Sequence, residues 1–98
     1  MSFSPKSPIE RDYFGTDWTD ELETGETIAS AEVVVTIKRG KARDSNPAAM
    51  VSGAAAISGA VVSQLLIGGV PGVDYETSWK IVTSTPRTLE EKVPLLVR

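Results

Sequence analysis

The stretch from Ser45 to Val73 contains no charged residue, and this absence constrains the fold more than any other feature. Within it, Ala48–Ile67 is long and uncharged enough to suggest a membrane-spanning helix. The stretch is, however, built from alanine, glycine and serine as much as from large aliphatic residues. Its glycines and β-branched residues weaken a helix, whereas two strands separated by a turn at Ser58-Gly59 fit the pattern. We therefore expect two strands, with a soluble helix and a membrane span as the alternatives.

The last third of the chain alternates regularly between apolar and polar residues. Asp74–Ile81 has one apolar row that includes Tyr75 and Trp79, as expected for a strand with one buried face. After the turn-like residues 84–87, a second alternating segment runs to the C-terminus, and Pro94 places it at a sheet edge or at a bulge. The two segments predict a β-hairpin.

Three strands are expected upstream of the hairpin, and one of them, Val61–Ile67, is the second strand of the uncharged stretch. Glu32–Lys38 is rich in β-branched residues, and Ile28 belongs to the same strand with a bulge between. Arg11–Trp18 is the first strand. Val61–Ile67 is another, and either of two sets can face inward: Val62, Gln64 and Leu66, or Val61, Ser63, Leu65 and Ile67. Six or seven short strands with turns between them predict an all-β fold, an immunoglobulin-like antiparallel β-sandwich.

Tyr75 follows a glycine- and proline-rich turn, residues 68–72, at the entry to a strand. In immunoglobulin-like sandwiches a tyrosine at such a corner bonds through its hydroxyl to the backbone a few residues upstream. The alternative is that Tyr75 is simply an aromatic residue of the core.

Charges gather in two clusters of opposite sign. Eight acidic residues and one basic residue lie between Glu10 and Glu32, and four basic residues follow soon after: Lys38, Arg39, Lys41 and Arg43, offset by Asp44. One interpretation is that both clusters are solvated loops. The other is that the two patches meet between neighbouring copies in an assembly and set their orientation.

Two residue types that are central to enzymatic chemistry are missing, which leaves carboxylates, lysines and hydroxyls as the possible catalytic groups. The chain has no histidine and no cysteine, which removes the commonest general base and the commonest zinc ligands. The acidic residues Asp17, Asp20, Glu21 and Glu23 lack the spacing of a calcium loop, and residues 68–72 lack the lysine of a phosphate loop. We therefore expect no catalytic, cofactor-binding or metal-binding residues and no enzyme. A net charge of −3 argues against nucleic acid as a partner.

The chain is expected to contain one folded domain, residues 10–98. Residues 1–9 are polar and contain Pro5 and Pro8, so they predict an extended arm that orders on a partner and no signal peptide. The uncharged strands would make a poor solvent-facing surface, because extensive exposed apolar area marks an interface, and uncharged edge strands invite pairing with another chain.

Several short motifs, in their order along the chain, resemble a family of short fibre–tail adaptor-like virion proteins of tailed phages and prophages. The resemblance covers most of residues 6–98, and the motifs are Asp12-Tyr13, Asp17-Trp18, Leu22, Gly25-Glu26-Thr27-Ile28, Ile57-Ser58-Gly59, Gly68-Gly69, Gly72, Tyr75 and Pro86-Arg87. The chain departs from the family at Pro86, where glycine is usual, and at Gln64, where an apolar strand residue is expected. The resemblance implies an immunoglobulin-like sandwich and carries over no catalytic residue.

The function expected from the resemblance is that of a phage structural protein in the tail, the neck or the fibre–tail junction. Its partners would be other virion structural proteins and further copies of itself, with no cofactor, nucleic acid or membrane involved. It would be made in the host bacterial cytoplasm and end up in the virion. The alternatives are an immunoglobulin- or fibronectin-like adhesion module and, more remotely, a small membrane-spanning protein.

Overall fold

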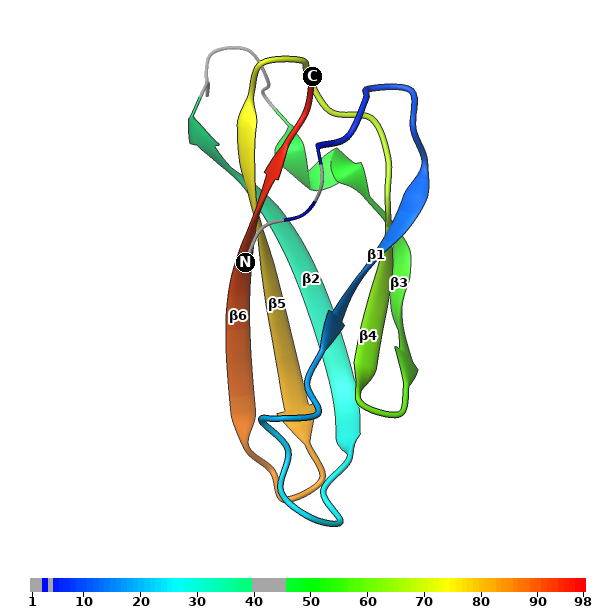
Figure 1. Ribbon diagram of the computed structural model, residues 1–98, viewed down its shortest axis with the longest axis vertical. Coiled ribbons are helices and arrows are strands. Elements are labelled where there is room, and N and C mark those ends of the chain that lie inside the picture. Colours follow the sequence, from blue (N-terminus) through cyan, green and yellow to red (C-terminus); the bar gives the residue numbers. More distant parts are fainter. Residues whose placement is uncertain (1–2, 4, 40–45) are drawn as a thin grey trace.

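The computed structural model describes residues 3, 5–39 and 46–98. Within these residues, six strands form two three-stranded antiparallel sheets (Figure 1). One sheet has the order β1-β4-β3, and its strands are β1 (Asp12–Asp17), β4 (Val61–Leu66) and β3 (Val51–Ser58). The other has the order β2-β5-β6, with strands β2 (Ile28–Arg39), β5 (Asp74–Thr83) and β6 (Thr88–Leu96). A 3-10 helix, η2 (Pro47–Met50), leads into β3.

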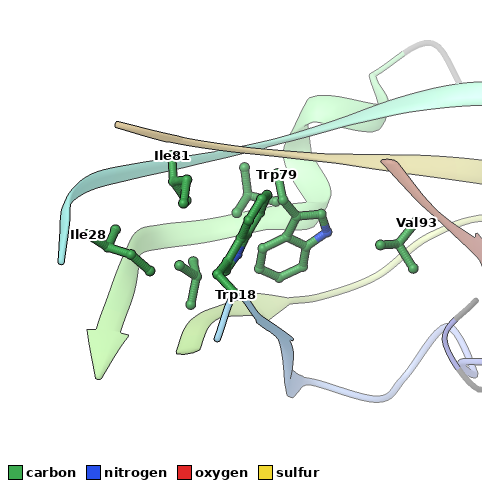
Figure 2. Close-up of a cluster of buried hydrophobic side chains, with 7 residues drawn as sticks. Trp18, Ile28, Trp79, Ile81 and Val93 are labelled. Atoms are coloured by element: carbon green, nitrogen blue, oxygen red, sulfur yellow. The ribbon is translucent and has the colours of Figure 1, made fainter. Parts of the chain in front are cut away.

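The two sheets pack face to face, which confirms the predicted all-β sandwich. Trp18, which directly follows β1, shares one buried cluster with Trp79 and Val93 of the opposite sheet (Figure 2). Val62 of β4 belongs to the same cluster. The indole N–H of each tryptophan donates a hydrogen bond of 2.8 Å to the hydroxyl of the threonine two residues earlier, Thr16 or Thr77. Both large rings are therefore buried with their polar atoms satisfied. The order β1-β4-β3 over β2-β5-β6 is that of strands B-E-D and C-F-G in immunoglobulin sandwiches.

The uncharged stretch forms two strands, as predicted. β3 and β4 pair around a turn at Gly59-Ala60, and Gly59 has a φ of 59°, which glycine adopts without strain. No helix among the described residues is long and apolar enough to cross a membrane. The helical alternatives for this stretch are therefore wrong.

The predicted C-terminal hairpin is confirmed. β5 and β6 pair antiparallel, and the inward row of β5 is buried along its whole length, from Tyr75 to Thr83. Pro94 lies on β6, an outer strand of its sheet, which is where a residue without an N–H is tolerated. The expected bulge in β2 is present as a shift of register between Ile28 and Ser30.

The inward face of β4 consists of Val62, Gln64 and Leu66, and each of these is no more than 1% exposed. Gln64 is buried because β3 bulges opposite it, where the register shifts between Ser52 and Ala56. Its amide nitrogen donates to the carbonyl oxygens of Ser52 at 2.9 Å and Gly53 at 3.2 Å. The glutamine therefore satisfies backbone groups that the bulge takes out of the ladder.

Tyr75 fulfils both roles proposed for it. Its ring is fully buried, in a cluster with Leu66 and Leu95. Its hydroxyl oxygen accepts a hydrogen bond of 2.9 Å from the backbone N–H of Val70, within the turn that precedes β5. The residue thus holds the connection between the two sheets at the start of β5, as in a tyrosine corner.

The described residues of the N-terminal arm lie along β6 of the same chain, contrary to the expectation that the arm orders on a partner. Backbone N–H groups of Phe3 and Lys6 donate to Pro94 and Leu96, at 3.2 and 2.9 Å. The Phe3 ring packs 5.1 Å from that of Phe14, measured between ring centres, which supplies the apolar contact that the arm's composition did not suggest. The assignment of residues 10–98 as the domain stays a prediction.

Candidate interaction surfaces

The outer face of the β1-β4-β3 sheet is almost free of charge. Cross-strand neighbours share a face, so the register places eight uncharged residues there: Tyr13, Gly15, Ser52, Ala56, Ser58, Val61, Ser63 and Leu65. We call this set the neutral face. Tyr13 is 66% exposed and Val61 37% exposed. Asp17, opposite Val61 at one corner, is the charged residue of the same row. An antiparallel sheet whose outer face meets only water normally places polar side chains there.

The outer face of the other sheet has the opposite character. Glu32, Lys80 and Glu90 lie opposite one another across the three strands, and Glu76 and Lys92 occupy neighbouring rows. Alternating signs on adjacent strands stabilise such a face and keep it soluble. The two outer faces of one small domain therefore differ sharply in charge, and only one carries charged side chains across all three of its strands.

A carboxylate is buried at the end of the molecule where β1, β2 and the β5–β6 hairpin meet. Glu26 was expected in a solvated acidic loop, but its side chain is fully buried. It pairs with the Arg87 guanidinium, accepting from Nε at 3.0 Å and also from Nη2. It accepts two further hydrogen bonds from the hydroxyls of Thr83, at 2.6 Å, and Thr85. These contacts connect the loop before β2 to the β5–β6 turn.

The bonds to Arg87 hold the pKa of the Glu26 carboxyl well below its ordinary range, and those to Thr83 and Thr85 act in the same direction. Arg87 Nη2 also donates to the carbonyl oxygen of Glu21 at 2.9 Å, so the guanidinium fixes the acidic loop from two sides. Sequence reasoning missed this pair because its members are 61 positions apart and no local pattern connects them.

The other acidic residues of this loop are exposed, as both interpretations of the acidic cluster require. Asp20, Glu21 and Glu23 are exposed on the loop between β1 and β2. Asp17 is exposed as well, and its carboxylate accepts from the hydroxyl and the backbone N–H of Thr19, at 2.6 and 2.9 Å. The hydroxyl bond is the main reason that the pKa of the Asp17 carboxyl is lowered.

The opposite end of the molecule carries the described part of the basic cluster. Lys38 and Arg39 are exposed at the end of β2, whereas Lys41, Arg43 and Asp44 lie outside the described residues. An open hollow of about 260 Å³ lies beside them, with Tyr75, Pro94, Leu95 and Leu96 among its lining residues. Asp74 lines it too, so the hollow combines two cations and one carboxylate at its rim with apolar walls.

The turn before β5 performs a structural role. Gly68 supplies a carbonyl oxygen that accepts from the buried Lys6 ammonium at 2.6 Å. Burial lowers the pKa of that ammonium, and Glu10 opposes the shift. Among the residues described, no three acidic, histidine or cysteine side chains gather into a group that could hold a metal ion.

These surfaces and the strand order define a small β-sandwich domain whose described surfaces are suited to contact with other chains. A comparison with protein families makes the assignment specific. The chain belongs to the family described as podophage GP4 fiber-tail adaptor protein gp77, which matches residues 6–96. A search of curated proteins gave no match.

Proposed function

We propose that this chain is a non-enzymatic structural protein of the phage virion, which joins tail, neck or fibre components through protein–protein contacts. The family indicates a fiber-tail adaptor, and therefore contact with other tail proteins. The neutral face is the observation on the molecule itself that supports this function. It is an exposed sheet surface that lacks the charges carried by the other sheet.

The proposed contact surface has the physical character of a protein interface. Desolvating a charged group is costly, so the centre of an interface is depleted in charge and enriched in residues such as tyrosine. The neutral face presents Tyr13 beside small, uncharged residues, which allow a partner to approach closely. The described residues of β3, at one edge of this sheet, are also uncharged, so the interface can extend along that edge.

The proposal places the protein in the virion after synthesis in the cytoplasm of the host bacterium. Its partners are other virion structural proteins, and several copies occupy one assembly. The composition of the chain favours proteins over nucleic acid as partners, because a net charge of −3 offers no overall attraction to phosphate.

Quantitative mass spectrometry of purified particles tests the proposal. The protein is expected in particles at a fixed ratio to tail proteins, and its absence from particles would end the hypothesis. A matched pair of variants tests the surface: Val61→Arg on the neutral face and Val34→Arg on the charged face. The native side chains are similarly exposed, 37% and 40%. Only Val61→Arg should reduce incorporation, whereas equal incorporation of both variants would remove the neutral face from the account.

A further inference from the structure

The acidic loop and the described basic residues lie at opposite ends of an elongated molecule. β2 begins at Ile28, next to the acidic loop, and ends at Arg39 (Figure 1). The longest dimension of the molecule is 43 Å, about twice each of the other two. The ends are thus separated by several Debye lengths at physiological ionic strength, so they do not neutralise each other within one copy.

The carboxylates of the acidic loop are available for an external partner. Among the described residues, the ion pairs are Glu26–Arg87, which is part of the fold, and Arg39–Asp74. Asp20, Glu21 and Glu23 take part in neither. The loop that presents them is held in place by the Arg87 bond to the Glu21 carbonyl, so its charges project from a fixed backbone.

The hollow at the other end has a form that suits such a loop. Lys38 and Arg39 contribute positive charge, and Leu96, which is 41% exposed, contributes apolar surface. The pairing of Arg39 with Asp74 spans 3.8 Å, and the arginine side chain is 85% exposed. Such a long, solvated pair is weak, so the guanidinium can turn to a partner's carboxylate at little cost.

We propose that this hollow receives the acidic loop of a second copy of the chain, so that copies associate head to tail. Charge complementarity selects this occupant, because two acidic ends would repel each other and two basic ends would do the same. The contact joins unlike surfaces, so it can repeat from one copy to the next. The inference rests on the proposed assembly function, for which it names one partner surface.

Sedimentation equilibrium of the isolated protein at low and high salt tests the contact. Wild-type protein should associate at low ionic strength, and 0.5 M salt should weaken that association at least about tenfold, because screening acts on exposed charges. Neutralising the hollow with Lys38→Gln/Arg39→Gln should also weaken it at least about tenfold. The control Lys80→Gln/Lys92→Gln removes the same charge from the charged face and should leave association unchanged.

Charge reversal gives a second, independent test. Lys38→Glu/Arg39→Glu and Asp20→Lys/Glu21→Lys should each be monomeric alone, and mixing them should restore association because every junction again joins opposite charges. Intrinsic tryptophan fluorescence verifies that each variant is folded.

A wild-type chain that stays monomeric at low salt, hollow and control variants that behave alike, or a mixture that does not associate would each overturn the proposal. A chain that is monomeric yet incorporated into particles would refute the head-to-tail contact and leave the adaptor function standing.

Discussion

Replacing Tyr75 with phenylalanine removes the hydroxyl that forms the hydrogen bond at the tyrosine corner. The ring is fully buried and stays in place, so the substitution opens no cavity of consequence. The substitution removes the acceptor that the Val70 N–H reaches at 2.9 Å. The bond is partly buried, and leaving a backbone donor there without its acceptor costs about 1–3 kcal/mol. We expect the free energy of unfolding to fall by about that amount.

The chain supplies its own control, because its second tyrosine, Tyr13, is 66% exposed. Tyr13→Phe removes a hydroxyl from the surface and should change the free energy of unfolding by no more than about 0.5 kcal/mol.

Urea unfolding followed by the fluorescence of Trp18 and Trp79, both buried, measures the two variants. With a slope of about 1–1.5 kcal/mol per molar urea for a domain of this size, the Tyr75→Phe midpoint should fall by roughly 1–2 M. Equal midpoints for Tyr75→Phe and Tyr13→Phe would refute the role assigned to the corner.

Three further substitutions test other contacts. Gly69→Ala places a methyl group 2.7 Å from a Val97 methyl at a φ of 99°, so it should cost more than Gly25→Ala, where φ is also positive but space is open; urea midpoints compare the two. Gln64→Leu should destabilise the protein by about 1–3 kcal/mol although leucine is more hydrophobic, because the carbonyl groups of the β3 bulge lose their hydrogen-bond donor. An unchanged urea midpoint would contradict this. Folding lowers the pKa of the Glu26 carboxyl. Its contribution to the free energy of unfolding is therefore complete above the ordinary pKa of 4.5 and is lost as the pH falls toward the pKa in the folded protein. Glu26→Gln should therefore flatten the decline of stability below about pH 4.5 in acid titrations, and an unaltered acid limb would contradict the assignment.

Much of the strand pattern could be predicted from the sequence because alternation is a local signal. The β5–β6 hairpin has an apolar row at every second position, and the bulge after Ile28 appears in the sequence as a break in that period. The inward face of β4 could not be chosen, since both rows are mostly apolar. What decides it is the β3 bulge, where backbone carbonyl groups need the amide of Gln64.

The interaction surfaces were only partly predictable from the sequence, because they depend on contacts between segments that are far apart along the chain. The absence of charge after Ser45 is visible in the sequence, but the neutral face arises only when β1 and β3 pair on either side of β4. The partnership of Glu26 with Arg87, and the position of Phe3 against Phe14, depend on contacts between distant segments. From composition, Glu26 was expected to be exposed to solvent, and the N-terminal arm was expected to order on a partner. In the folded protein, both Glu26 and the described residues of the arm contact other residues of the same chain.

Electron microscopy of phage particles assembled without this chain tests the adaptor function most directly. If the chain joins fibres or other components to the tail, such particles should lack those components, and supplying the wild-type protein should restore them. Particles that are complete and infectious in its absence would contradict the proposed function.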